Sequence, residues 1–479
     1  MRWLVFAALA ACTHPKDPVS ELEDPSTCMQ CHPQHYTQWS GSMHAYASDD
    51  PVFVAMHARG QRETGGQLGT FCVQCHAPMA VVLGIVDDTN AASFDPTALP
   101  ATARGITCYF CHDVKSVAAD HNNGLVLALD QTMRGGAPNP AETPAHDSLY
   151  DTTIISGDNN NSSMCGSCHD VVTPSPPSPA SVALERTYQE WQTTFFSAPN
   201  DPLHHLSCGN CHMVASRDVI AQGPGLNVST RDNGYHDHFF PGIDQALTPW
   251  PQMDTMATEI ASILNPAVNI TGATPITGPP IPGGICVVPL GGGEITVRMD
   301  SQSVGHRWPS GASQDRRAWL EVIAYDASNN VLFQSGIVPD GMDPEDVADP
   351  NLFGLWDRIF KSDGTPAHFF WEVATEDIEL LKAPVTLDPN DPAFDHSSTK
   401  VFPIGALSAQ VDHITARILI RPLNLALMNL LVQSGDLDAS LPSQLQTLVT
   451  GTGGTPFRTW TRANQDGATG CCPVGMPSC

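Results

Sequence analysis

The feature that most constrains the fold of this chain is a pentapeptide, C-x-x-C-H, that occurs five times between Cys28 and His212. Two cysteines at this spacing can each form a thioether with one vinyl group of a single haem, and the adjacent histidine then coordinates the iron. A C-x-x-C pair alone would also suit a zinc half-site or a redox dithiol. Neither alternative explains a histidine after every second cysteine, so the pattern predicts five covalently attached c-type haems. The residues predicted to hold them are Cys28, Cys31, His32, Cys72, Cys75, His76, Cys108, Cys111, His112, Cys165, Cys168, His169, Cys208, Cys211 and His212.

The spacing of the motifs indicates that the haems share one core. The motifs begin at residues 28, 72, 108, 165 and 208, so each interval has room for a helix or two and a loop. Such a segment is too short to fold independently around its own haem. We therefore predict one pentahaem domain over residues 28–245, mainly α-helical and irregular, packed around the covalent haems. Within it, apolar residues at helical spacing predict a helix over Val182–Phe196.

The N-terminus has the pattern of a secretory leader. Arg2 precedes an apolar run, too short to span a bilayer, that ends in small residues before Cys12. Leu9-Ala-Ala-Cys12 resembles the bacterial lipobox, which implies cleavage before Cys12 and acylation of its thiol. The alternative is a simple signal peptide with an incidental cysteine. We predict a signal peptide over residues 1–11, a tether over 12–27, and a protein of the periplasm or outer-membrane surface, anchored in a bacterial membrane through lipidated Cys12.

The charge of the chain limits its partners. There are 22 basic and 50 acidic residues, which give a formal charge of −28. Nucleic acid is excluded as a partner because binding it requires a basic face. Redox partner proteins with a basic patch are expected, since opposite charges speed the encounter. The alternative is that the charge serves only solubility.

A different pattern follows the predicted haem domain. Residues 246–293 change in character, and Asn265–Gly293 is rich in proline, glycine and threonine, which predicts a linker or an irregular wrap. A two-residue alternation then indicates half-buried strands. Strands are expected at Ile295–Asp300, Trp319–Tyr325, Val331–Gln334 and Ile414–Ile420, and a helix from Pro422 to Gly435. Several strands with long loops predict a β-sandwich-like domain over 294–435, followed by a cysteine-containing tail over 436–479.

Four cysteines lie outside the motifs and the leader. They could form two disulfides in three pairings, between which the sequence does not choose. Disulfides are permitted because haem attachment already implies an oxidising compartment. The four are Cys286, Cys471, Cys472 and Cys479.

Segments around the motifs carry a further pattern. Near the motifs these segments are Trp39-Ser-Gly-Ser-Met-His44-Ala, Gly105-Ile-Thr, Thr187-Tyr-Gln-Glu-Trp191 and Cys208-Gly-Asn-Cys-His-Met213. Later segments are His236-Asp-His238-Phe-Phe-Pro-Gly242, Gly305-His306-Arg-Trp-Pro-Ser-Gly311 and Arg317-Ala-Trp-Leu-Glu-Val322. The first group resembles the bacterial multihaem cytochromes of the cytochrome c-554 type, and the second resembles members that append a β-domain. The resemblance covers roughly residues 26–435 and implies electron transfer outside the cytoplasm through closely packed, mostly bis-His haems. The type member has four haems, so the packing order of the haems cannot be carried over.

The sixth ligand of each iron decides between a closed electron carrier and an open site for a substrate. His44 matches the Ser-x-His-Ala ligand position of the family, and His146 precedes the fourth motif where the family often has a ligand. His238 is a better candidate than His236, and His306 lies in a glycine-flanked turn of the predicted β-domain. The alternative for each is a structural histidine. The candidate distal ligands are His44, His146, His238, His306 and His121.

The other histidines and two methionines are weaker candidates. Met43 and Met79 could reach an iron, but ordinary packing is expected for both. The reserve ligands are His35, His57, His204 and His205. The histidines expected to be structural in the β-domain are His368, His396 and His413.

Three functions fit these residues, and we predict the first of them. The first is an electron relay in which protein ligands close every iron. The second is a reductase or oxidase of a small nitrogen or sulfur species at one five-coordinate haem, with Arg104, Tyr109 and Arg134 as possible pocket residues. Pentahaem nitrite reductases are a poor match, because their active haem usually carries lysine and all five motifs here end in histidine. A third possibility is that the β-domain binds a partner protein.

Overall fold

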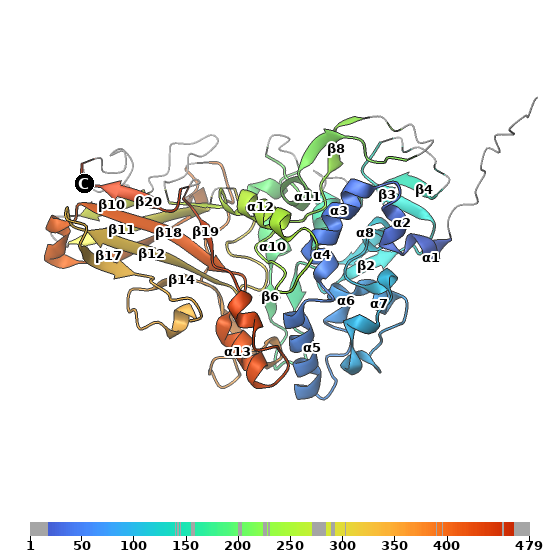
Figure 1. Cartoon of the computed structure of the whole chain (residues 1–479), viewed down its shortest axis with the longest axis horizontal. Helices are drawn as coiled ribbons and strands as arrows, with labels where there is room; N and C mark the ends of the chain where they lie inside the picture. The colour runs from blue at the N-terminus through green and yellow to red at the C-terminus, as the bar shows by residue number, and fades with distance from the viewer. Residues whose placement is uncertain are drawn as a thin grey trace, which may run out of the picture.

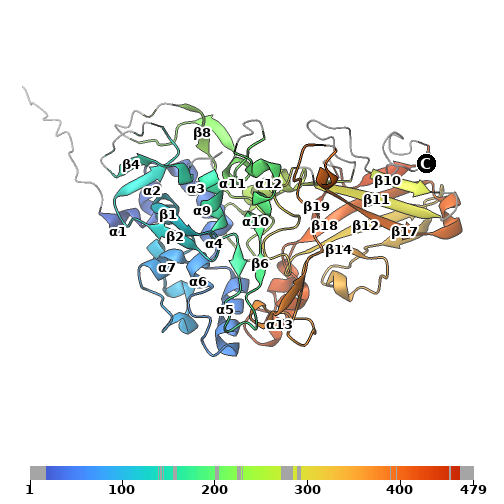
Figure 2. The ribbon, with the colours of Figure 1, turned by 180° about the vertical axis from the view of Figure 1, so that it is seen from behind.

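The computed structural model places two parts of the chain side by side along the long axis of the molecule (Figure 1). The first part carries the five motifs and consists of short helices and loops, and the second consists mainly of antiparallel sheets. Figure 2 shows the same division from behind. The structure describes residues 18–463 except 139, 141–142, 144, 155–158, 200–203, 224–227, 229, 271–283, 289–292, 302, 389, 395 and 453–454.

Short helices build the first part because proline repeatedly starts a new helix. In the 13-residue helix α5, Pro51 occupies the first turn and the Asp50 side chain accepts a hydrogen bond from the Val52 N–H. The helices of this part are α1 (Val19–Leu22), α2 (Pro25–Cys28), α3 (Pro33–Gly41), α4 (Met43–Tyr46), α5 (Pro51–Glu63), α6 (Val73–His76), α7 (Pro78–Val82), α8 (Cys108–His112), α9 (Asn159–Gly166), α10 (Thr187–Gln192) and α11 (Cys208–His212).

Four two-stranded ladders lie between these helices. They pair β1 with β2, β3 with β4, β5 with β6 and β7 with β8, and only the β3–β4 pair is parallel. The strands are β1 (Val114–Ala119), β2 (Gly124–Leu127), β3 (Thr132–Gly135), β4 (Asp147–Tyr150), β5 (Val171–Val172), β6 (Ala183–Glu185), β7 (Ala215–Asp218) and β8 (Arg231–His236).

The helix predicted over Val182–Phe196 is wrong at both ends. Residues 183–185 form β6 because they pair with β5, and the helix α10 begins only at Thr187 and ends at Gln192. The helical spacing of Tyr188 and Trp191 is nevertheless real, since both side chains are buried on one side of α10. Tertiary pairing therefore overrides the local periodicity.

Two antiparallel sheets make up most of the second part. One has the order β10–β11–β17, with β9 also paired to β11; the other has the order β13–β12–β18–β19, with β14 and β20 paired to β12 and β18. Ile295 and Val297 of β11 share one apolar core with Leu320 of β12 and Ile418 of β18. The strands are β9 (Val268–Asn269), β10 (Gly284–Val288), β11 (Glu294–Ser301), β12 (Arg317–Tyr325), β13 (Val331–Ser335), β14 (Phe353–Leu355), β15 (Arg358–Phe360), β16 (Thr375–Asp377), β17 (Ser397–Pro403), β18 (His413–Arg421), β19 (Leu448–Thr450) and β20 (Arg458–Thr461).

The strands expected from the sequence in this region are confirmed as β11, β12, β13 and β18. The expected helix is confirmed as α13 (Leu425–Gln433), although it begins later than Pro422. The start is set by Asn424, whose side chain accepts hydrogen bonds from the N–H groups of Ala426 and Leu427.

Three of the predicted connecting segments carry ordered structure. The stretch 246–293, expected as a linker, contains helix α12 (Met253–Leu264) and strands β9 and β10, which extend the sheet at β11. The tail 436–479 contains β19 and β20, which pair with β18. The tether 12–27 is helical from Val19, and Leu22 is buried. Composition did not reveal these elements, because it does not record pairing or packing with a distant segment.

Several predictions concern residues beyond the described ones. The signal peptide over residues 1–11, the lipidated Cys12 and the tail cysteines at 471, 472 and 479 lie outside the described residues. Cys286 lies in β10, but its side chain is not described. Among the described helices, none is long and apolar enough to cross a membrane.

The two parts meet at a shared apolar cluster between α5 and α13, which lie next to each other in Figure 1. Val52 and Ala55 of α5 pack there with Leu427 and Leu431 of α13. The indole Nε1 of Trp371 donates a hydrogen bond to Glu63 at 2.9 Å. The position of the motif-bearing part relative to the sheets is thus fixed by buried contacts.

Candidate haem-binding sites

Each motif forms about one helical turn. The N–H of His32 donates to the carbonyl of Cys28 at 2.7 Å, and His169 donates in the same way to Cys165 at 3.1 Å. In a helical turn, residues i, i+3 and i+4 lie on one side, so both thiols and the imidazole of a motif face the same space. All ten motif cysteines are free thiols, available for thioether bonds.

In every motif, Nδ1 of the proximal imidazole lies within hydrogen-bond distance of an oxygen atom. A carbonyl oxygen can only accept, so Nδ1 is the donor and Nε2 keeps the lone pair that binds a metal. One acceptor differs, because it is the Glu185 carboxylate, 3.4 Å from Nδ1 of His169. The carbonyl acceptors are Ile220 for His32 at 2.6 Å, Ala47 for His76 at 3.2 Å, Arg134 for His112 at 2.6 Å and Pro241 for His212 at 2.7 Å.

Three proximal histidines face a second histidine. Two imidazoles that bind one metal ion from opposite sides have ring centres roughly 6 Å apart, since each metal–nitrogen bond is about 2 Å and each nitrogen lies about 1 Å from its ring centre. The observed separations fit this value. They are 6.5 Å for His32 and His146, 6.3 Å for His112 and His238, and 6.2 Å for His169 and His44.

Two of the distal candidates, His44 and His306, are in the protonation state that coordination needs. Desolvation inside the protein lowers the pKa of His44 to about 3, with a smaller contribution from His169. The pKa of His306 is lowered to about 4, again mainly by desolvation, although its Nδ1 donates to the Arg307 carbonyl at 2.7 Å. Both imidazoles are therefore neutral at pH 7, as a metal ligand must be.

His306 reaches the haem region from the sheet-containing part. Its imidazole is close enough to His212 for the charge of that ring to affect its pKa. The turn that carries it packs on α10, where Glu190 accepts hydrogen bonds from Arg307 N at 3.1 Å and Ser310 Oγ at 2.9 Å. Gly305 lies against Trp191 of the same helix. The structure thus brings the turn that carries His306 onto α10, between the fourth and fifth motifs in the sequence.

His76 differs from the three proximal histidines that face a second histidine, because its ring packs on a phenylalanine. Its imidazole stacks on the ring of Phe53, with centres 4.0 Å apart and an interplanar angle of 1°. His57, one turn further along α5, donates its Nε2–H to the Ala91 carbonyl at 2.8 Å, and its buried Nδ1 has no partner. That bond occupies the nitrogen through which a histidine usually binds haem iron.

Four other histidines have contacts with their neighbours. His121 lies between β1 and β2 with Nδ1 3.0 Å from the Asp120 carboxylate, and the structure does not bring it to a proximal histidine ring. His35 packs between Tyr235 and His238, with ring centres at 4.4 and 4.6 Å. The backbone N–H of the exposed His368 donates to Glu372, and Nδ1 of His413 contacts Asp412.

The possible pocket residues of the enzyme hypothesis have structural partners. Arg134 is buried and pairs with Asp113 and Asp130 at 3.3 and 3.2 Å. The Tyr109 hydroxyl donates to the Asp130 carbonyl at 2.9 Å, and Arg104 pairs with Asp49. These contacts hold the loop around the third motif.

Contacts between thiols show which motifs are neighbours. The Cys28 thiol interacts with Cys108, which joins the first and third motifs. In the fourth motif, Cys165 interacts with Cys208 and Cys168 with Cys75. The fourth motif therefore adjoins both the second and the fifth.

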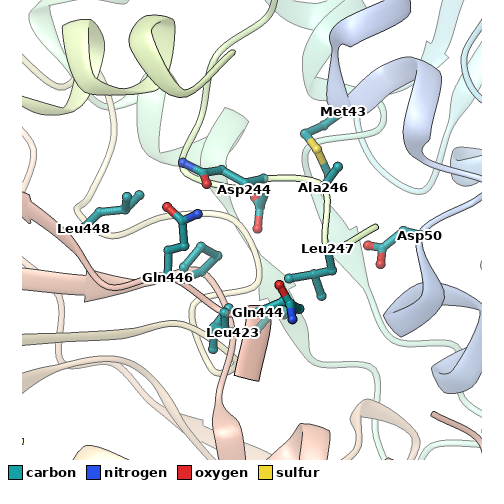
Figure 3. Close-up of a pocket in the computed structure, with 12 residues that line it drawn as sticks. Met43, Asp50, Asp244, Ala246, Leu247, Leu423, Gln444, Gln446 and Leu448 are labelled. Carbon is teal, nitrogen blue, oxygen red and sulfur yellow. The ribbon is translucent and has the colours of Figure 1, made fainter. Parts of the chain in front are cut away.

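A small cavity of about 60 Å³ lies at the boundary of the two parts, lined by Asp50, Asp244, Leu247 and Gln444 among others (Figure 3). Desolvation raises the pKa of Asp50 to about 6, and the charge of Asp244 adds to the shift. The volume suits a few water molecules rather than a substrate.

The comparisons with known proteins agree with this picture. Residues 27–113, which include the first three motifs and His44, match the family described as Cytochrome c554 and c-prime. The chain is also similar to the crystal structure of a penta-heme cytochrome c552 from Thermochromatium tepidum, with a TM-score of 0.54 and 20% identity, over 91% of this chain and 99% of that one. No curated protein matches the sequence significantly. The resemblance to multihaem c-type cytochromes is confirmed, and the chain has a multihaem cytochrome-like fold.

Proposed function

We propose that this chain is a pentahaem c-type cytochrome that relays electrons through mostly bis-His haems outside the cytoplasm. Haem-based electron transfer is supported by the family match and the fold. When bound, haem supplies the one-electron chemistry. The observation that carries the proposal is that three proximal imidazoles each face a second histidine at 6.2 to 6.5 Å.

The geometry supports one ligand assignment. His146 would complete the site of the first motif, His238 that of the third, His44 that of the fourth and His306 that of the fifth. Each distal residue comes from a segment remote from its partner motif, so ligation would tie the chain together. The two sheets that share a core would form a β-sandwich-like domain whose turn at His306 belongs to the redox unit.

Location and partners are part of the same proposal. Haem attachment and the leader support a protein of the periplasm or outer-membrane surface, lipid-anchored through Cys12. The acidic chain would dock with basic faces of redox proteins, because complementary charge speeds the encounter.

A second candidate function rests on the site of the second motif. Phe53 packs on His76, and His57 uses its Nε2 on a carbonyl. An iron held by His76 with an open sixth position could bind a small nitrogen or sulfur species. The chain would then be a multihaem reductase or oxidase with four electron-transfer sites.

The test is an EPR spectrum of the oxidised protein, quantified against a chemical haem assay. Five haems with at least four low-spin signals would support the relay. Fewer than five haems, or several high-spin irons, would overturn it. If one haem is high-spin, binding of nitric oxide, nitrite or hydroxylamine to it decides for the second function.

A further inference from the structure

The five proximal histidines do not have equivalent partners. Four donate Nδ1–H to a neutral backbone carbonyl, and His169 alone donates to a carboxylate, that of Glu185. A hydrogen bond to an anion raises the electron-donating power of an imidazole more than a bond to a neutral acceptor. The site of the fourth motif is thus electronically distinct.

The backbone holds Glu185 in this place. Glu185 is the last residue of β6 and pairs with Val171 of β5, which follows the fourth motif directly. On the other side, the N–H of Tyr188 donates to the His169 carbonyl at 3.2 Å. The motif and the carboxylate therefore belong to one small hydrogen-bonded unit.

The charge of Arg316 acts on Glu185, but both Arg316 and the adjacent Arg186 are also paired with other carboxylates. Arg316 binds Asp244 through both terminal nitrogens at 3.1 and 3.0 Å, and Arg186 pairs with Asp170 at 3.3 Å. The Glu185 side chain is 19% exposed, whereas the His169 ring that it contacts is 54% exposed.

We infer that Glu185 is a positioning and tuning residue that lowers the reduction potential of the iron held by His169, relative to a neutral partner. The inference rests on the proposed function, because it requires haem at the fourth motif. A carboxylate beside the proximal ligand stabilises the oxidised iron, whose charge is one unit more positive than that of the reduced iron. Since this motif adjoins the second and the fifth, its potential would govern exchange of electrons among them.

The experiment compares the holoprotein with its Glu185→Gln and Glu185→Asp variants by redox titration monitored by EPR. The Gln variant keeps the size and can still accept a hydrogen bond, but it loses the charge. One of the five midpoint potentials should rise in Glu185→Gln, and the other four should stay in place. In Glu185→Asp the charge remains, so the same potential should rise less.

The affected signal must belong to the fourth motif. His44→Ala removes the histidine that faces His169, so the low-spin signal lost in that variant identifies the site. The inference is overturned if the assigned signal does not shift in Glu185→Gln, or if all five potentials shift together. The haem count and the wild-type low-spin signals test the proposed function separately, because they do not depend on Glu185.

Discussion

The imidazole rings of His44 and His169 lie 6.2 Å apart, although His44 belongs to α4 and His169 to the fourth motif. The backbone around His44 is fixed from a third segment, because its carbonyl accepts a hydrogen bond from Ile106 N–H at 2.9 Å. The indole of Trp39 in turn donates to the Ile106 carbonyl at 2.7 Å. Two segments singled out by the family resemblance thus hold one candidate ligand in place.

Replacing His44 with alanine should convert one haem in five from low-spin to high-spin. The variant removes the imidazole that faces His169 and leaves the thioether attachment of all five haems intact. EPR of the oxidised protein measures the change. His121→Ala is the control, and it should leave the spectrum unchanged because His121 lies on an exposed turn beside Asp120. An unaltered His44→Ala spectrum would contradict the assignment.

Gly105→Ala should disturb the same site without touching the ligand itself. Gly105 has φ +61°, and an added Cβ would lie 2.6 Å from the carbonyl oxygens of His44 and Ala45. Gly65 is a matched control, since its φ is +62° and nothing lies within 4 Å of an added Cβ. Both substitutions cost about 1–2 kcal/mol of backbone strain. Only Gly105→Ala should also displace His44 and produce a high-spin signal in EPR. If Gly105→Ala and Gly65→Ala gave the same EPR spectrum, the predicted displacement of His44 would be wrong.

Gly60→Ala should weaken the junction of the two parts. Alanine is favoured over glycine in a helix by about 1 kcal/mol. Here, however, an added Cβ would lie 2.7 Å from Leu68 Cδ1 and 2.9 Å from the ring of Trp371, whose indole is fixed by Glu63. Overpacking costs about 1–3 kcal/mol, so the variant should melt at a lower temperature. Gly135→Ala is the control, and its melting temperature should not fall, because nothing lies within 4 Å of an added Cβ there. A rise in melting temperature for Gly60→Ala would show that the junction can relax.

Glu376→Gln should stabilise the protein at alkaline pH. Desolvation raises the pKa of Glu376 from 4.5 to about 7, and the charge of Asp357 adds to the shift. Between about pH 4.5 and 7 the native carboxyl keeps its proton while the unfolded one loses it, so this group's contribution to stability falls as pH rises. Glutamine cannot ionise. Calorimetry should therefore find a higher melting temperature than wild type at pH 8 and a much smaller difference at pH 4, where the carboxyl is mostly protonated in both states. A lower melting temperature than wild type at pH 8 would contradict the predicted direction of the stability change.

The sequence predicted much of the fold where the signal was local. The second half of β12 and the first half of β18 bury residues in alternation, and that pattern is visible in the chain. The stretch 246–293 was read as a linker because its composition resembles one, yet β10 is ordered by pairing with β11. No sequence pattern pointed to Glu185, since its proposed role depends on the β5–β6 pairing that places it beside His169.

By itself the sequence determined where haem can attach and which histidine is proximal. Those groups sit within one helical turn, so spacing alone brings Cys28, Cys31 and His32 together. Only the tertiary structure decided which histidine faces which motif, because His44, His146 and His238 approach His169, His32 and His112 from remote segments. A distant contact depends on how the whole chain packs, and neither spacing nor composition records that packing.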